Sequence, residues 1–187
     1  MTKILVTGGA GFVGTHLLKE LTGVKDTEVV VLDNLDTGSE ENVPAGMNFI
    51  PLDIVDRRVE DLFNEEKFDI VIHLAGHGDV EESLDDPIED AAINILGSLN
   101  ILENSKKYGV KIIIYLACAE LEENSSQQDV SPKTFCDASK LTVENYFKLY
   151  NKLYGMNCTV IKPLDQKKDA DTLADIYAKE IFEEICA

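Results

Sequence analysis

The sequence predicts an α/β domain built on a doubly wound parallel sheet. Two observations support this prediction. Short, wholly apolar runs alternate with longer amphipathic stretches, and a glycine-rich turn separates the first apolar run from the first amphipathic stretch. Strands that are apolar throughout are typical of parallel sheets covered by helices on both faces and joined by right-handed crossovers. We therefore expect a three-layer αβα arrangement of about six strands in the order 3-2-1-4-5-6.

The first strand and helix flank the glycine turn. Residues Lys3 to Thr7 are typical of a buried strand, and Phe12 to Leu21 carry apolar residues at helical spacing. Gly9, Gly11 and Gly14 lie at the turn from this strand into the helix, with the spacing of a dinucleotide-binding turn. Glycines there permit a tight turn, a close approach of the backbone to a pyrophosphate and close helix–strand packing, while the helix N-terminus supplies N–H donors.

The second strand strengthens this interpretation. Residues Glu28 to Leu32 form an apolar strand pattern that ends in Asp33. An acidic residue about 20 positions after the turn is the expected acceptor for a ribose 2′-hydroxyl. A carboxylate at this place also repels a 2′-phosphate, so the pattern predicts a Rossmann-type site that prefers NAD to NADP.

The later elements continue the alternation. The polar stretches at 34–46 and 120–130 are typical of loops, and Gly155 is expected just after a helix end. Nothing in the sequence divides the chain, so we expect residues 1–187 to form a single dinucleotide-binding domain. The remaining strands are expected at Asn48 to Pro51, Asp69 to Leu74, Lys111 to Ala117 and Cys158 to Ile161, and the remaining helices at Val55 to Lys67, Pro87 to Tyr108, Pro132 to Tyr154 and Asp169 to Ile185.

Composition excludes several classes of function. With 35 acidic and 17 basic residues the net charge is -18, which argues against binding to nucleic acid or to anionic membrane surfaces. No apolar run is long enough to cross a membrane and no signal peptide is evident, so a cytoplasmic location is expected. The four cysteines are widely spaced and form no zinc-finger or disulfide pattern, so no metal site is predicted from spacing.

Several motifs together resemble the extended short-chain dehydrogenase/reductase family, specifically its NAD-dependent nucleotide-sugar epimerases and dehydratases. The resemblance covers about residues 3 to 163. The motifs that carry it, in family order, are Lys3 to Gly14, Leu32 to Gly38, Ile72 to Ala75, Asp86 to Gly97 and Ala138 to Lys140. The resemblance implies NAD(H) as cofactor, a nucleotide sugar as substrate and a homodimer formed through the helices at 87–108 and 132–154.

The resemblance also implies roles for individual residues. Asp53 has an alternative role as the cap of a helix beginning at Val55. The implied contacts are Gly8, Gly11, Phe12, Val13 and Gly14 with the pyrophosphate, Asp33 and Asn34 with the adenosine ribose, Asp53 and Ile54 with the adenine edge, Leu74, Ala75 and Gly76 with the central part of the cofactor, Lys140 with the nicotinamide ribose and Pro163 beside the nicotinamide.

The expected catalytic residues depart from the family pattern. The family uses a Tyr four residues before the Lys and a Ser or Thr at the preceding strand end. Here Cys136 precedes Lys140, and Cys118 takes the place of the hydroxyl residue. Because thiols titrate below phenols and Lys140 is expected to lower the pKa of Cys136 further, basicity is no obstacle. Reach is the obstacle, since the sulfur ends several ångströms short of a substrate oxygen.

A second departure from the family pattern lies after Pro163, where the family continues into a smaller substrate domain. Here one helix follows this position, so we expect no separate substrate domain. Three hypotheses follow. The first is a cofactor-binding domain, truncated and with impaired catalysis. The second is an enzyme with altered chemistry, either thiol-based or using a metal held by His77, Cys118 and Cys136. The third is an engineered or generated minimal scaffold without activity.

His73 lies in an apolar strand, so we expect it to be a hydrogen-bonded core residue.

Overall fold

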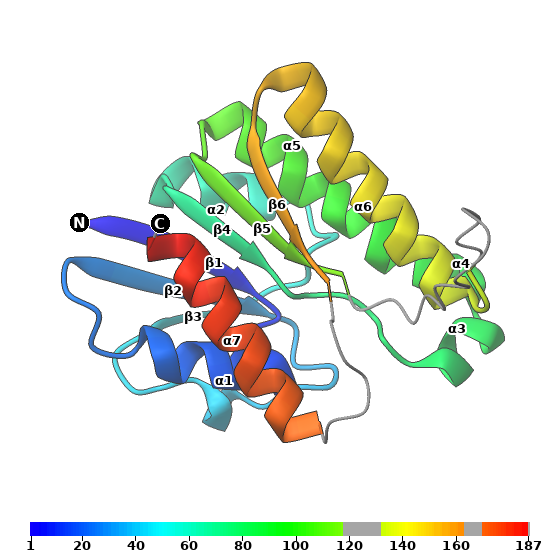
Figure 1. The fold of residues 1–187 in the computed structure, drawn as a ribbon, viewed down its shortest axis with the longest axis horizontal. Helices are drawn as coiled ribbons and strands as arrows, with labels where there is room; N and C mark the ends of the chain where they lie inside the picture. The colour runs from blue at the N-terminus through cyan, green and yellow to red at the C-terminus, as the bar shows by residue number, and fades with distance from the viewer. Residues whose placement is uncertain (118–131, 163–169, 187) are drawn as a thin grey trace.

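A single six-stranded parallel sheet forms the centre of the computed structural model, which describes residues 1–117, 132–162 and 170–186 (Figure 1). The strand order β3-β2-β1-β4-β5-β6 confirms the predicted topology. The order reverses between β1 and β4, which places a crevice at the carboxyl ends of these two strands. The strands are β1 (Thr2–Thr7), β2 (Thr27–Asp33), β3 (Asn48–Pro51), β4 (Ile70–His73), β5 (Ile112–Leu116) and β6 (Asn157–Ile161).

Helices cover both faces of this sheet, as expected for three layers. Helices α1 (Phe12–Leu21) and α7 (Ala170–Cys186) lie side by side on one face (Figure 1). Helices α2 (Val59–Glu66), α5 (Ser98–Tyr108) and α6 (Phe135–Tyr154) pack on the other. The shorter helical segments are η1 (Glu40–Asn42), α3 (Val80–Asp85), α4 (Pro87–Ala91) and the π-helical segment η2 (Ala92–Gly97).

Alternating strand side chains divide the core in two. On β1, Leu5 packs with the α2, α5 and α6 layer, whereas Ile4 and Val6 pack with α1 and α7. This alternation is the two-residue period of a strand with both faces buried. On α7, Tyr177 and Ile181 are buried in the second half of the core, so the last helix closes this face against α1.

Two helices begin later than the sequence suggests. The helix expected from Val55 begins at Val59, because two short aspartate turns come before it. Asp53 Oδ1 accepts the Val55 N–H at 3.0 Å, and Asp56 Oδ1 accepts the Arg58 N–H at 2.8 Å. Aspartate turns of this kind compete with the first helical hydrogen bonds.

The helix expected from Pro132 begins at Phe135, where a capping box fixes its start. The Thr134 hydroxyl accepts the Asp137 N–H at 3.0 Å, while the Asp137 carboxylate accepts the Thr134 N–H at 3.2 Å. Helix α3, which the sequence analysis did not anticipate, is capped by Asp79 in a similar way. Among the described helices, none has the length and apolar character needed to cross a membrane.

Replacing Phe147 by Ala should destabilise the fold by about 3 to 5 kcal/mol, because the ring is fully buried in α6 and its loss leaves a cavity. The ring centroid lies 4.9 Å from that of Tyr115 on β5. Phe135 begins the same helix but is 50% exposed, so Phe135→Ala serves as the matched control, with a loss below about 1 kcal/mol. Urea unfolding measures both, and equal losses would contradict this account of the core.

Candidate functional site

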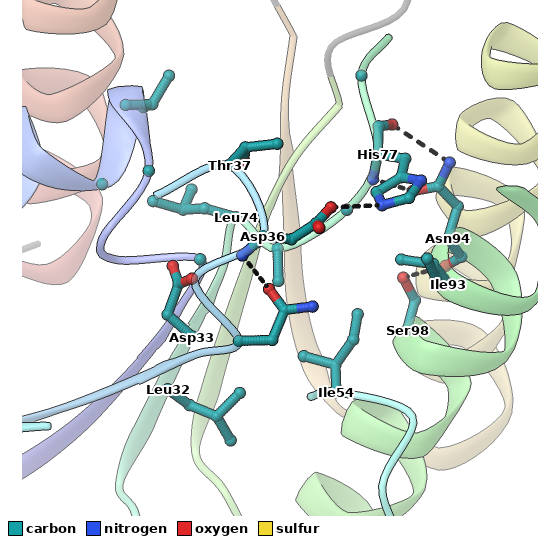
Figure 2. A pocket seen from close by; sticks show the side chains of 18 of the residues that line it. Leu32, Asp33, Asp36, Thr37, Ile54, Leu74, His77, Ile93, Asn94 and Ser98 are labelled. Atoms are coloured by element: carbon teal, nitrogen blue, oxygen red, sulfur yellow. Dashed lines mark hydrogen bonds and ion pairs between the residues drawn. The ribbon is translucent and has the colours of Figure 1, made fainter. Parts of the chain in front are cut away.

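A cavity of about 320 Å³ opens at the carboxyl ends of the central strands. Its walls come from the segments that follow β1, β2, β3 and β4, and η2, β5 and α6 close one end. Figure 2 shows side chains from the segments after β2 and β4 approaching each other across this space. The cavity lies at the reversal of strand order, where open α/β sheets bind ligands.

The floor of the cavity is formed by the glycine turn, in which two positions exclude any side chain. Gly8 has φ +70°, and a Cβ on it would lie 2.6 Å from the Ala75 backbone nitrogen. A Cβ on Gly14 would lie 2.5 Å from the Gly8 carbonyl oxygen. Gly11 is the N-cap of α1 and has no side chain to bind the first helical N–H groups. The helix therefore presents backbone donors and its positive end to the cavity.

The Asp33 carboxylate ties the end of β2 to this turn. It is 7% exposed; its Oδ2 accepts the Ala10 N–H and its Oδ1 accepts the Leu35 N–H, both at 2.9 Å. The next residue, Asn34, donates from Nδ2 to Asp53 Oδ2 at 2.9 Å. Asp53 thus joins the segment after β3 to the segment after β2, in addition to capping the turn at Val55.

The structure brings the predicted cofactor residues together. Pro163 lies outside the described residues, and so does the predicted catalytic Cys118. Every other predicted cofactor residue lines the cavity, namely Gly8, Gly11, Phe12, Val13, Gly14, Asp33, Asn34, Asp53, Ile54, Leu74, Ala75, Gly76 and Lys140.

Sequence reasoning missed several lining residues, of which Asn94 is the most connected. Its Oδ1 accepts the His77 N–H at 2.8 Å, and its Nδ2 lies 2.9 Å from Asp90 Oδ1 and 3.0 Å from Ser139 Oγ. The sequence did contain a signal for this residue, because Asn94 is a polar residue on the apolar face of a predicted helix. The other lining residues without an assigned role are Leu32, Asp36, Thr37, Leu52, Gly78, Ile93, Ser98, Tyr115 and Leu116.

The helix expected over Pro87 to Tyr108 is interrupted where Asn94 lies. Residues Ala92–Gly97 form a π-helical turn between α4 and α5. A π turn inserts one extra residue into a helix and is frequent at functional sites. Here it allows a buried asparagine to bind the backbone of the segment after β4, and the prediction of one unbroken helix was wrong at this point.

His73 is a core residue at the centre of a hydrogen-bond chain, as expected. Its Nδ1 lies 2.7 Å from Thr7 Oγ1, and its Nε2 lies 2.8 Å from Ser98 Oγ. The Ser98 hydroxyl donates to the Asn94 carbonyl at 2.5 Å, which assigns the imidazole proton to Nε2. Complete burial lowers the pKa of His73 from its usual 6.5 to about 4, so the ring is neutral near pH 7.

Cys136 is buried below the cavity and does not line it. The residue is 3% exposed, and its Sγ donates to the His77 carbonyl at 3.5 Å. Burial raises the pKa of the Cys136 thiol, and this effect outweighs the attraction of Lys140. Lys140 does lower the pKa of this thiol, as expected, but burial, which the sequence analysis did not include, raises it by more. Lys140 itself is 9% exposed and lines the cavity.

The structure does not test the hypothesis of a metal held by His77, Cys118 and Cys136, because Cys118 lies outside the described residues. Within residues 1–117, 132–162 and 170–186, no three His, Cys, Asp or Glu side chains are grouped to hold a metal ion. The His77 imidazole lies 3.4 Å from Asp36 Oδ2, whereas Cys136 binds the His77 backbone instead.

The family of the chain follows from a comparison with known families. Residues 4–165 match the model of the NAD dependent epimerase/dehydratase family. The chain belongs to this family. As a member of the NAD dependent epimerase/dehydratase family, it spans about half the length of the curated relatives that it matches.

Relatives of known structure share the fold of this epimerase/dehydratase domain. The UDP-glucose 4-epimerase of Mycolicibacterium smegmatis is 32% identical over 173 residues, which cover 86% of this chain and 55% of that protein. The Thermotoga maritima UDP-glucose 4-epimerase with UDP-glucose has a TM-score of 0.81 and 34% identity, covering 86% of this chain and 55% of that one. The Thermus thermophilus UDP-glucose 4-epimerase in complex with NAD has a TM-score of 0.78 and 33% identity, covering 98% and 63%.

The low pKa of His73 predicts a pH-dependent stability. In the unfolded chain the imidazole regains its usual pKa, so below about pH 6.5 unfolding takes up a proton. His73 therefore contributes stability above that pH, and up to about 3 kcal/mol of it is lost as the pH falls toward 4. Urea unfolding of wild type and His73→Gln should show a smaller loss in the variant. His16→Gln is the control and should keep the wild-type slope; equal slopes in wild type and His73→Gln would contradict the assignment.

Proposed function

We propose that the chain binds NAD(H) in the cavity and that the oxidoreductase chemistry of its family is impaired. Three observations support cofactor binding: the side-chain-free cradle at Gly8 and Gly14, the Asp33 carboxylate beside it, and the membership in an NAD dependent family. The related Thermus thermophilus enzyme is a complex with NAD. The cavity is lined by both apolar and polar residues, and a helix N-terminus lies at its floor. Such a site suits a ligand that contains a pyrophosphate bridge.

Each part of the cavity has a partner for one part of the ligand. Backbone N–H groups at Gly11, Phe12 and Val13 would hold the pyrophosphate, and Asp33 would accept a ribose hydroxyl. Asp53 and Ile54 would border the adenine. The segment Leu74, Ala75 and Gly76 would follow the middle of the ligand, and Lys140 would bind the second ribose. When bound, NAD supplies a hydride acceptor for the oxidation of a hydroxyl group.

The proposed impairment of catalysis rests on one observation, which is the buried position of the Cys136 thiol. A general base must reach the proton that it removes and must have a suitable pKa. The Cys136 thiol fails on both counts, because it is bonded to the His77 carbonyl below the cavity and burial raises its pKa. Lys140 remains at the cavity, but a lysine held as an ammonium donates protons and does not accept them.

We also propose a substrate class, an oligomeric state and a cellular location for this chain. The relatives named above are UDP-glucose 4-epimerases, so a nucleotide sugar is the substrate class to test first. A homodimer through α4, η2, α5 and α6 and a cytoplasmic location are the corresponding expectations. Light scattering after gel filtration tests the dimer, and a monomer at working concentration would contradict it.

Calorimetric titration should show saturable binding of NAD⁺ and NADH. NADP⁺ should bind at least about ten-fold more weakly, because the Asp33 carboxylate repels a 2′-phosphate. Asp33→Asn removes this charge and should narrow the difference between NAD⁺ and NADP⁺. Since Asp33 also anchors Ala10, the unfolding midpoint of the variant must be measured alongside. A cooperatively folded wild type without saturable binding would refute the proposal and favour the scaffold hypothesis.

With UDP-glucose as substrate, the wild type should form no detectable UDP-galactose. If the thiol-based alternative holds, turnover will be present and Cys136→Ala will abolish it. Turnover that persists in Cys136→Ala would also contradict the proposed impairment, because it would place the catalytic base elsewhere. Cys136→Tyr tests whether a phenol four residues before Lys140 suffices, with cofactor binding measured in the same sample as the control for folding.

A further inference from the structure

Two walls of the cavity are firmly anchored at their bases. In the wall after β2, the Asn42 side chain donates to the Ala10 carbonyl at 2.9 Å, and Asn34 is bonded to Asp53. In the wall after β4, the backbone of His77 is held by Asn94 and by the Cys136 thiol. The backbones of both walls are therefore held in place by these hydrogen bonds.

One side-chain pair joins these walls across the cavity. His77 Nε2 lies 3.4 Å from Asp36 Oδ2, and both residues line the cavity. Figure 2 shows the Asp36 carboxylate and the His77 imidazole pointing toward each other from opposite walls. The His77 side chain is 19% exposed and the Asp36 side chain 58%, so the pair lies at the mouth of the cavity and not in its floor.

We propose that Asp36 and His77 form a clasp that gates the entry and exit of the dinucleotide. This inference rests on the proposed NAD(H) site and adds a kinetic role for two residues of this chain. A ligand that enters the cavity must separate the two side chains, and the clasp can close again over it. Because the pair is partly exposed, separating the two side chains costs little free energy. The clasp therefore slows the passage of the dinucleotide several-fold without preventing it.

Other ionisable groups surround His77. They are Asp90, reached through Asn94, and Cys136 and Lys140 on α6. Asp33 and Asp53 line the wall that faces it. The Asp36 carboxylate is the group that contacts the imidazole itself, so the clasp depends on this one pair.

A gate differs kinetically from a direct contact with the ligand. Removing a gate speeds association and dissociation together and leaves the dissociation constant nearly unchanged. Removing a contact between His77 and a phosphate speeds dissociation alone and weakens binding. The two roles therefore predict different results for the same variants.

Stopped-flow fluorescence with NADH should distinguish them. His77→Gln and Asp36→Asn should each raise both rate constants about three-fold, with the dissociation constant within about two-fold of wild type. The double variant should add little to either single one, because the clasp needs both partners. His16→Gln is the matched control, since His16 faces Asp175 at 3.8 Å outside the cavity.

A dissociation rate that rises alone, or rates that do not change, would overturn the clasp while leaving the cofactor site intact. An NMR spectrum of the free protein gives a second readout that needs no ligand. The imidazole signals of His77 should shift in Asp36→Asn, because the ring loses the carboxylate that lies 3.4 Å from it. Unchanged imidazole signals would show that the pair does not form. A wild type that fails to bind NADH while the pair forms would refute the proposed function instead.

Discussion

The close approach of helix α1 to the end of strand β1 is the constraint on which the site depends. Any side chain at Gly8 or Gly14 would collide with backbone atoms of the neighbouring segments. With these positions bare, Ala10 comes within reach of the Asp33 carboxylate and of Asn42. The glycine turn thus fixes the helix N-terminus and also the wall after β2. A single added methyl group would displace the start of α1 and Asp33 together.

The second wall depends on a buried polar network instead of on close backbone contact. His73 connects β1 to α5 through Thr7 and Ser98, and Ser98 connects in turn to Asn94. Asn94 then holds the His77 backbone at the edge of the cavity. Buried polar groups stabilise a fold only when their partners are all present, so such a network selects one arrangement of its members. The position of the wall after β4 is set in this way from the centre of the sheet.

The sequence predicted the features that depend on local pattern. The strand order follows from the apolar runs and the glycine turn, and the cavity-lining residues were implied by the resemblance to a known family. The π turn at Ala92–Gly97 was not predictable, because its reason is a contact between Asn94 and a segment distant in sequence. Helical spacing revealed Lys140 one turn from Cys136, and Lys140 does lower the pKa of the thiol. The net rise of this pKa could not be predicted, because the burial of Cys136 depends on packing. The Asp36 and His77 pair likewise joins two loops that no periodicity relates.

A net charge of -18 does not oppose the binding of an anionic dinucleotide at this site. Distant surface carboxylates are screened over about 8 Å at physiological salt, whereas the N–H groups at the start of α1 act at contact distance. Of the described residues that line the cavity, Lys140 is the one lysine or arginine, and Asp33, Asp36 and Asp53 are the acidic residues. Anion binding must therefore come mainly from backbone donors at a few fixed points. In a ligand with an additional phosphate away from those points, that phosphate has no donor to pair with and is repelled by the carboxylates. The acidic lining therefore selects against such a ligand, while the backbone donors still allow a dinucleotide to bind.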